Sequence, residues 1–462
     1  MVSLILLFFV SCDIDPYIVG QIESPEAFKN ALEEGKDSIV LKSGSYSFDD
    51  DLRISKSSRI YVNGSCANIS FASGKGIVVD ESVADGNVRF EDLNIDGKLL
   101  VNGGGSKSIE LVNTRIKDVE MAKDISSGGE MPRLELESSS IEGILLVTKN
   151  AYVELLDEKS KINSTIVDEN VEAYIVGCIE ELGDISSSKG KITEVIGGSG
   201  TESDPYRIKS PKQFKALFGT KKNYNPDDKQ IYAKLQNDLV LDGSLNYYLT
   251  KTVLDGNMHS LSIDNHYEDS QSLGTAIFGE VIGSTIENLI FDMEYSVALI
   301  AFAGKEDVVL RNVIARSDTP QKVPSGGAIF VVHAYIPGEG AVVSNTLTLE
   351  KCINEVEISM VEEQTADHGI FVGKNVQDKT IILDSCENRA TIVSYAKKMG
   401  VALGLSGSKS NKAKLKVVNF KNSGKISCTG YASFLTYDEE YNNSVNVISI
   451  GNPDDSEIEV IK

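Results

Sequence analysis

Apolar and polar residues alternate in short stretches between residues 88 and 141. Three stretches share one pattern, two apolar residues followed by an isoleucine seven positions after the first: Val88, Phe90 and Ile95; Ile109, Leu111 and Ile116; Leu134, Leu136 and Ile141. A period of two predicts β-strands with one buried and one outer face. We therefore expect these apolar residues in a core, with Arg89, Glu110 and Glu135 outside it. The stretches begin 21 and 25 residues apart, as loops of different length on a coil would produce.

A second pattern repeats with a constant period of 34 residues near the C-terminus. The repeated positions are Leu349, Cys352, Asn354 and Ile358; Leu383, Cys386, Asn388 and Ile392; Val417, Phe420, Asn422 and Ile426. Helix-pair repeats share such a period. These stretches, however, are rich in Val, Ile and Thr, are interrupted by Gly, and lack the Ala/Leu face of a helix pair. Each period therefore predicts one turn of a β-solenoid.

Stacked turns of a solenoid lie about 4.8 Å apart. Asn354, Asn388 and Asn422 should then form a ladder in which each side-chain amide donates to the next, a structural rather than a ligand-binding role. Cys352 should lie above Cys386. A disulfide between them is geometrically possible at this spacing. We favour stacked free thiols acting as small apolar groups.

Two similar segments suggest end caps. Ser24-Pro25 with Phe28, and Ser210-Pro211 with Phe214, each predict a short Ser-capped helix with an apolar face. A solenoid needs such a cap to cover the apolar end of its first coil. With a Gly/Ser-rich joint at 197–200, we expect an all-β chain of two right-handed parallel β-helices in series, each with an N-terminal capping helix. The expected segments are 1–15, a signal and lipobox segment; 16–195, the first β-helix; and 196–462, the second, with the 34-residue repeats.

The N-terminus resembles a bacterial lipoprotein signal. Met1 to Val10 is wholly apolar and leads into Ser11 and Cys12, with Asp13 following. Such a stretch is too short to span a bilayer and matches the apolar region of an export signal. The resemblance implies lipidation of Cys12, export, and attachment to the membrane of the cell envelope through a lipid anchor.

Composition limits the partners. The chain has 462 residues, with 68 acidic against 45 basic side chains, a formal net charge of −23. Nucleic acid is excluded as a partner, because phosphate binding needs basic stripes that are absent. The acidity is explained by surface solubility, with cation binding as the alternative. We expect no cofactor and no metal site, since no two of the four histidines have the spacing of zinc ligands. These histidines are His259, His266, His333 and His368.

Several motifs resemble known surface proteins. Gly200-Thr201-x-x-Asp204-Pro205-Tyr206, with the later Leu254-Asp255-Gly256-Asn257, resembles the opening of right-handed parallel β-helix domains of the pectin-lyase-like superfamily on bacterial surfaces. The segments 369–373 and 400–404 are similar to the glycine-rich GLUG-type repeats of bacterial adhesins. The resemblance implies this fold and a surface setting, and it transfers no catalytic residue.

The same superfamily contains polysaccharide lyases and glycoside hydrolases, so catalytic acids must be considered. The candidates are Asp242, Asp255, Asp264 and Asp292. Asp242-Gly243 and Asp255-Gly256 are also ordinary turn pairs, which we favour. An enzyme would be marked by three or more exposed carboxylates beside an Arg or Lys on one sheet.

Exposed tyrosines would favour glycan binding. The available ones are Tyr247, Tyr248, Tyr431, Tyr437 and Tyr441. Alternatively, Tyr431 and Tyr437 pack the last coil together with Phe434 as its cap, which we favour. We predict an adhesin or binding module for an extracellular glycan or for a protein of a host or neighbouring cell, without catalysis. A polysaccharide lyase or hydrolase and a purely structural surface component are the alternatives. Asp242, Asp255, Tyr247, Tyr248 and Tyr437 are the weak ligand candidates.

Overall fold

The computed structural model describes residues 20–460 except for a set of short segments. The omitted positions are 64, 127, 220–228, 243–245, 265–275, 294–296, 305, 322–327, 335–344, 360–367, 376–379, 395–397, 407–413, 429–430, 436–445 and 451–457. Contacts divide the chain into two compact units, Met1–Val195 and Ile196–Lys462. Both units are built of parallel β-sheets, which confirms the prediction of an all-β parallel solenoid fold.

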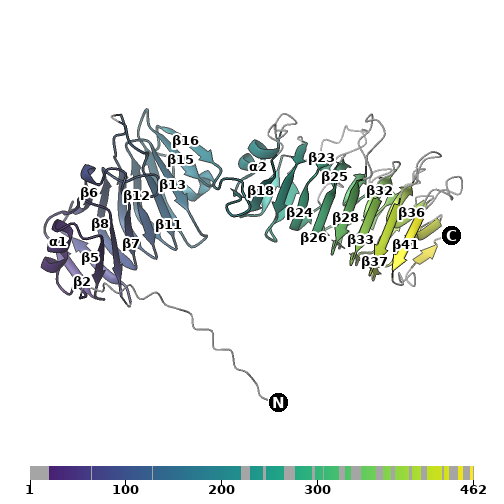
Figure 1. Cartoon of the computed structure of the whole chain (residues 1–462), viewed down its shortest axis with the longest axis horizontal. Helices are drawn as coiled ribbons and strands as arrows, with labels where there is room; N and C mark the ends of the chain where they lie inside the picture. Colours follow the sequence, from purple (N-terminus) through teal and green to yellow (C-terminus); the bar gives the residue numbers. More distant parts are fainter. Residues whose placement is uncertain are drawn as a thin grey trace, which may run out of the picture. The chain divides into compact units, whose positions relative to one another are not determined.

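Unit 1 contains two eight-stranded sheets, here sheets A and B (Figure 1). Sheet A is ordered β1 (Ser38–Leu41), β4 (Ser58–Val62), β7 (Val88–Glu91), β9 (Glu110–Val112), β11 (Arg133–Glu137), β13 (Ala151–Leu155), β15 (Glu172–Val176) and β16 (Lys191–Val195). Sheet B is ordered β14 (Lys161–Val167), β12 (Ser140–Val147), β10 (Arg115–Met121), β8 (Leu93–Val101), β5 (Ala67–Phe71) and β2 (Ser45–Phe48), with β3 (Leu52–Ile54) pairing β6 (Gly76–Val79) and β6 pairing β8.

The alternating stretches of the sequence stack in register. Leu111 lies opposite Phe90 on one side and Leu136 on the other in sheet A. In sheet B, Ile116 lies between Ile95 and Ile141. All of these side chains are buried, at most 3% exposed. The core of unit 1 therefore consists of stacked apolar columns, with the intervening polar residues on the outer faces.

A recurring left-handed residue turns the chain from sheet A to sheet B. Asp92, Asn113 and Ser138 have φ values of 60°, 45° and 49°. Asn and Asp tolerate this region better than most residues. The residue after the bend supplies a buried hydroxyl in two coils, and the Thr114 backbone N–H donates to Ser139 Oγ at 2.9 Å. These bonds satisfy backbone donors that the bend removes from the strand ladder.

Unit 2 contains three sheets, here C, D and E. Sheet C follows the order β17 (Tyr206–Ile208), β18 (Ile231–Leu235), β21 (Thr252–Asp255), β24 (Thr285–Asp292), β26 (Val308–Arg316), β28 (Thr346–Glu350), β33 (Thr380–Asp384), β37 (Lys414–Val418) and β41 (Asn446–Ile450), joined by β19 (Leu239–Leu241), β22 (Ser260–Ile263), β29 (Ile353–Asn354), β34 (Glu387–Asn388) and β38 (Lys421–Asn422). Sheet D contains β20 (Tyr247–Thr250), β23 (Ala276–Ile282), β25 (Ala298–Ala303), β27 (Val331–His333), β32 (Val372–Asn375), β36 (Lys398–Ser406), β31 (His368–Gly369) and β40 (Tyr431–Leu435). Sheet E contains β30 (Ile358–Ser359), β35 (Ile392–Ser394), β39 (Ile426–Cys428) and β42 (Ile458–Val460).

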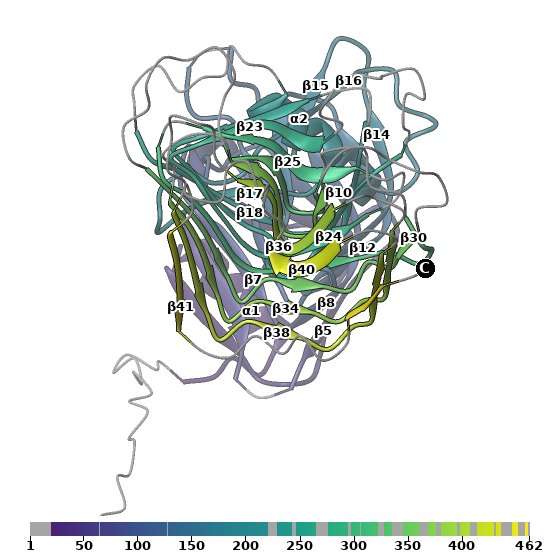
Figure 2. The ribbon, with the colours of Figure 1, turned by 90° about the vertical axis from the view of Figure 1, so that its right-hand side faces the viewer.

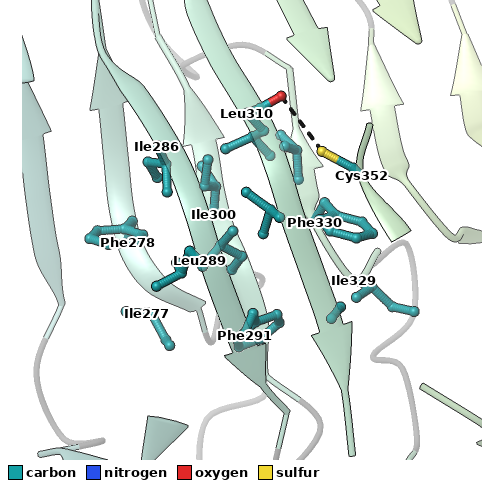
Figure 3. Close-up of a cluster of buried hydrophobic side chains, with 14 of the residues drawn as sticks. Ile277, Phe278, Ile286, Leu289, Phe291, Ile300, Leu310, Ile329, Phe330 and Cys352 are labelled. Atoms are coloured by element: carbon teal, nitrogen blue, oxygen red, sulfur yellow. Dashed lines mark hydrogen bonds between the residues drawn. The ribbon is translucent and has the colours of Figure 1, made fainter. Parts of the chain in front are cut away.

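The 34-residue repeat corresponds to successive coils of unit 2. Leu383 pairs with Leu349 in one neighbouring strand and with Val417 in the other. In the end-on view, β41, β36 and β30 lie on different sides of the coil (Figure 2), so sheets C, D and E enclose the core. Figure 3 shows part of this core, with buried side chains of β23, β24, β25 and β26 together with Ile329, Phe330 and Cys352.

Each unit contains one α-helix in the described part of the chain. Helix α1 (Pro25–Glu33) begins after Ser24, whose hydroxyl accepts from Ala27 N. Helix α2 (Pro211–Phe218) begins after Ser210, whose hydroxyl accepts from Gln213 N. Short 3₁₀ turns cover Glu81–Val83 and Ile179–Leu182. Neither α-helix has the length and apolar character of a membrane span within the described ranges.

The helices bury aromatic side chains against the first strands of each unit. Phe28 is fully buried and meets the Tyr46 ring edge-on at 6.2 Å. Phe214 packs edge-on against Tyr247 at 5.2 Å. Both helices therefore pack on strands of their own unit; their role as caps and the handedness of the coils stay predictions.

Candidate functional site

The outer face of sheet A carries charged and aromatic side chains in rows across successive strands. Because side chains alternate along a strand, the residues between the buried columns all point outward. One row contains Arg59, Arg89, Glu110, Glu135 and Glu154, each opposite the next in register. The row changes from basic to acidic along the stack.

Arginines and glutamates of this face form a connected set of ion pairs. Arg59 Nη2 lies 2.8 Å from Glu91 Oε2, and Arg89 Nε lies 3.2 Å from the same oxygen. Arg89 Nη1 donates to Glu110 Oε2 at 2.6 Å. Burial raises the pKa of Glu91, but the two guanidinium groups outweigh this effect and lower it overall. The Glu91 carboxylate is therefore anionic at neutral pH, and it is already paired with both arginines.

Arg133 connects the acidic end of the row to two aromatic rings. Its Nη1 donates to Glu154 Oε2 at 2.7 Å and lies 3.8 Å from Glu135 Oε1. Its guanidinium carbon lies 5.2 Å from the centre of the Tyr152 ring, within the range of a cation–π contact. The Tyr152 and Tyr174 rings, from neighbouring strands, are 5.2 Å apart. Both tyrosines are partly exposed.

Glu172 of β15 bonds to side chains of β16, the last strand of sheet A, and to Tyr174. Its carboxylate accepts from Lys191 Nζ at 2.5 Å, Thr193 Oγ1 at 2.6 Å and the Tyr174 hydroxyl at 3.0 Å. The hydrogen bonds from Lys191 and Thr193 lower the pKa of Glu172 to about 2. The Tyr174 ring is thus held in place by its own hydroxyl.

A shallow hollow of about 510 Å³ lies on this face over β7, β9 and β11. Its lining residues are Asn87, Arg89, Ser106, Lys107, Glu110, Leu111, Val112, Arg133, Glu135, Glu137 and Leu156. Three cationic and three anionic side chains line it, so the hollow is neutral overall. Leu156 is 46% exposed and gives the hollow an apolar patch. A second hollow, of about 660 Å³, lies on the outer face of sheet B and is lined mainly by short polar and charged side chains.

The asparagines of the 34-residue repeat lie in a buried ladder. Asn354 Nδ2 donates to Asn388 Oδ1 at 2.7 Å, and Asn388 Nδ2 donates to Asn422 Oδ1 at 2.7 Å. The first two side chains are fully buried and the third is 7% exposed. A ligand at the protein surface therefore cannot reach the side-chain amides of Asn354 and Asn388.

Cys352 and Cys386 are free, buried thiols. Cys352 Sγ donates to the carbonyl oxygen of Leu310 at 3.6 Å (Figure 3), and Cys386 Sγ donates to that of Leu349 at 3.3 Å. Burial, with the neighbouring Cys386, raises the pKa of Cys352 well above its usual value. Thiols in this state pack as small apolar groups and are poor nucleophiles.

The Asp candidates lie at the ends of strands β19, β21, β22 and β24. Asp255 Oδ1 accepts from Asn257 N at 2.9 Å and from Asn288 Nδ2 at 3.1 Å. The bond to the backbone two residues later is the structural role expected of Asp in an Asp-Gly turn. Asp242 and Asp264 are exposed at the ends of β19 and β22. Asp292 pairs with Arg316 at 3.3 Å.

Tyr247 is wrong as a ligand candidate. Its side chain is only 1% exposed and packs against Phe214 of helix α2, because the first residue of β20 points inward. Burial, together with the Asp242 carboxylate, raises its pKa to about 12. Tyr248, one position later, is partly exposed and lies on the outer side of the strand. Cys12 and Tyr437 lie outside the described residues, as do His266 and Tyr441; the side chains of Tyr431 and His368 are likewise not described.

The remaining histidines occupy structural positions. His333 is 4% exposed and stacks on the Phe302 ring at 5.0 Å. His259 Nδ1 lies 3.3 Å from Asp238 Oδ1 in a turn. Within the described ranges, no three His, Cys, Asp or Glu side chains are grouped to hold a metal ion.

Sequence reasoning placed Arg89, Glu110 and Glu135 on an outer face but missed the site that they form. The alternation predicts that these three side chains point away from the core, since each lies between two core residues. The alternation between residues 88 and 141 does not extend to Tyr152, Glu154 and Tyr174, although the pair Tyr152 and Glu154 repeats the pattern Arg133 and Glu135 one coil later. Aligning these coils by their buried residues would have identified the row.

Comparison with known proteins adds little to this geometry. No protein-family model matches the chain, and no curated protein matches it in sequence. A structure of a putative immunoglobulin A1 protease from Bacteroides ovatus is similar with a TM-score of 0.38 and 16% identity, covering 57% of this chain and 79% of that one. The catalytic domain of a GH87 α-1,3-glucanase in complex with nigerose gives a TM-score of 0.18 and 10% identity, covering 94% of this chain and 68% of that one. Likeness at these scores supports no inference about function.

Proposed function

We propose that the protein is an exported, lipid-anchored binding protein of the bacterial cell surface, an adhesin that holds an extended, uncharged glycan on the outer face of sheet A. The carrying observation is the neutral hollow on this face beside the partly exposed Tyr152 and Tyr174 rings. Rows of side chains repeat at the strand spacing of about 4.8 Å. A linear polymer lying across the strands would meet a polar or aromatic side chain at each strand, and many weak contacts add up to useful avidity.

Charge favours an uncharged ligand. Residues 1–195 hold 34 Asp and Glu against 19 Lys and Arg, a net charge of −15. An anionic polymer would be repelled by this unit. A basic peptide would be attracted to it, but the carboxylates of Glu91, Glu110 and Glu154 are already paired with arginines of the same face. Sugar hydroxyls can accept from and donate to such ion pairs without breaking them, and tyrosine rings offer apolar faces to sugar rings.

A polysaccharide lyase or hydrolase is the second candidate, and one observation favours it. Glu110, Glu135 and Glu154 lie on three successive strands beside Arg89 and Arg133, an arrangement that differs from the mark of an enzyme in that Glu154 is buried. A hydrolase needs one protonated and one free carboxyl group. Glu154 is instead 3% exposed and bonded to Arg133, so binding is the better-supported function. A purely structural surface component remains the third candidate.

The test uses soluble protein beginning after Cys12, immobilised and exposed to neutral, acidic and sulfated polysaccharides and to basic peptides. We expect retention of a neutral polysaccharide with no shortening of its chains. The double variant Tyr152→Ala and Tyr174→Ala should weaken retention about tenfold or more. Tyr232→Ala, which changes a partly exposed tyrosine of unit 2, is the matched control and should leave retention unchanged. Shortened chains would establish the enzyme, and retention of none of these polymers would overturn the binding proposal.

The anchor has its own test. Mass spectrometry of the protein isolated from its native membrane should find Cys12 as a lipidated N-terminal residue, because the lipobox-like segment ends at this position. An unmodified Cys12 within a longer peptide would remove the anchor and leave the binding face unaffected.

A further inference from the structure

The charge of Lys123 is enclosed by oxygen atoms at a corner of unit 1. Its side chain is 8% exposed. Its Nζ donates to Asp85 Oδ1 at 2.7 Å and to three backbone carbonyl oxygens: Gly104 at 2.7 Å, Glu130 at 2.9 Å and Ala84 at 3.1 Å. An ammonium group has three hydrogens. Four oxygens at these distances therefore surround the nitrogen more completely than its hydrogen bonds require.

The four oxygens come from three successive loops at one corner of the coil: 80–87, 102–109, and the described residues 122–126 and 128–132. Further bonds join the loops directly: Gly104 N donates to Ala84 O at 2.7 Å, and Glu130 N donates to Asp85 Oδ1 at 2.9 Å. The loops pack closely, since a Cβ on Gly105 would lie 2.4 Å from Asp85 O. The hydrogen bond from Lys123 is the main cause of the lowered pKa of Asp85. The corner is thus organised around one positive charge.

This corner forms one wall of the hollow on sheet A. Glu130 Oε2 accepts from Ser106 N at 2.9 Å and from Ser106 Oγ at 2.7 Å. Ser106 and Lys107 both line the hollow. Lys123 holds Glu130 through its backbone oxygen, so the ammonium fixes the residue that in turn fixes Ser106.

We propose that the oxygen cage around Lys123 is an internal cation site, occupied by the chain's own lysine, and that this cation positions the Ser106–Lys107 wall of the hollow. The oxygen distances exceed the roughly 2.3–2.6 Å that Ca²⁺ takes. One carboxylate and three carbonyl oxygens at this radius suit a large monovalent cation, as carbonyl rings do for K⁺. The consequence for ligand binding rests on the proposed function, whereas the cation site itself does not.

The test is chemical rescue of Lys123→Ala. This substitution removes three carbons and the nitrogen, and n-propylammonium supplies the same atoms. The melting temperature of unit 1 should fall by roughly 5–10 °C in the variant, because the cage oxygens lose their cation. Added n-propylammonium should restore much of the loss. Hydrogen exchange at the Ser106 amide should be fast in the variant and slow again with the amine.

Three controls make the result specific. Tetramethylammonium, which has no N–H, should not rescue at equal ionic strength. Lys159→Ala, at an exposed lysine, should lose little stability and should not respond to the amine. Glu130→Gln should speed hydrogen exchange at the Ser106 amide, and n-propylammonium should not reverse this change, because Lys123 contacts only the backbone oxygen of Glu130. Unchanged exchange at Ser106 in Lys123→Ala, or loss that n-propylammonium does not reverse, would overturn the proposal. Neither the melting temperature nor the exchange at Ser106 involves a glycan. The cation site can therefore be refuted or upheld whether or not the protein binds a glycan.

Discussion

Asn354 and Asn388 are 34 residues apart in the chain, and their side-chain amides are joined by a hydrogen bond of 2.7 Å inside the core. Asn388 also donates to the carbonyl oxygen of Ala390 at 3.2 Å, so each amide bonds both to the next coil and to its own bend. With both bonds made, the amide nitrogen and oxygen atoms have hydrogen-bond partners, without which their burial would be unfavourable. The ladder fixes the register between coils.

The middle amide should therefore matter most. Asn388→Ala removes an acceptor from Asn354 and a donor from Asn422, and it should lower the free energy of unfolding of unit 2 by about 3 kcal/mol. Chemical denaturation followed by circular dichroism measures this. Glu355→Gln, which weakens an exposed ion pair with Arg389, should cost less than about 1 kcal/mol. Equal losses in the two variants would mean that the ladder adds no stability.

The repeat and the alternation were visible in sequence because both are set by the core. An apolar residue at each rung must be buried whatever loop precedes it, so Phe90, Leu111 and Leu136 could be placed in one column. Unequal loops did not obscure this pattern. The bends were less visible, because Asp92, Asn113 and Ser138 share a left-handed conformation but not a residue type.

The candidate site was harder to predict than the fold. Tyr247 and Tyr248 are adjacent and equally aromatic, and only the register of β20 makes the first a core residue and the second an outer one. Tyr152 and Tyr174 meet across neighbouring strands although they are 22 residues apart in the chain, and Lys191 bonds to Glu172 from 19 residues further on. Their association depends on loop lengths that the alternation alone does not give.

Acid should weaken unit 1 through Asp157. Burial raises the pKa of this carboxyl group, but hydrogen bonds from Ser138 and Ser160 outweigh it and lower the pKa to about 2. A depressed folded-state pKa gives stability that is present above the unfolded value near 3.9 and is lost as pH falls toward 2. Allowing for solvent screening, the contribution is about 1 kcal/mol. The difference in unfolding free energy between wild type and Asp157→Asn, measured from pH 6 to pH 2.5, should shrink with acid; a constant difference would contradict this account.

The described cysteines should differ sharply in reactivity. Cys66 is partly exposed, whereas Cys178, Cys352 and Cys386 are buried. A thiol reagent added to the native protein should label Cys66 before the other three, and all four should react after unfolding in denaturant. Peptide mapping by mass spectrometry gives the order. A peptide pair linked through Cys352 and Cys386 without reducing agent would show that the thiols are oxidised instead.

Arg133 should link the stability of sheet A to its binding surface. Arg133→Met leaves Glu154, which is 3% exposed, without its cation, and should lower the unfolding free energy of unit 1 by about 3 kcal/mol. Adding Glu154→Gln removes the uncompensated charge and should recover at least half of that loss in a double-mutant cycle. Retention of a neutral polysaccharide should fall in both variants, because the guanidinium no longer stacks on Tyr152. Arg53→Met, which breaks an exposed pair with Asp80, is the control and should change neither stability nor retention appreciably. Full recovery of retention in the double variant would mean that the binding surface needs only the neutral charge, and that Arg133 itself makes no contact.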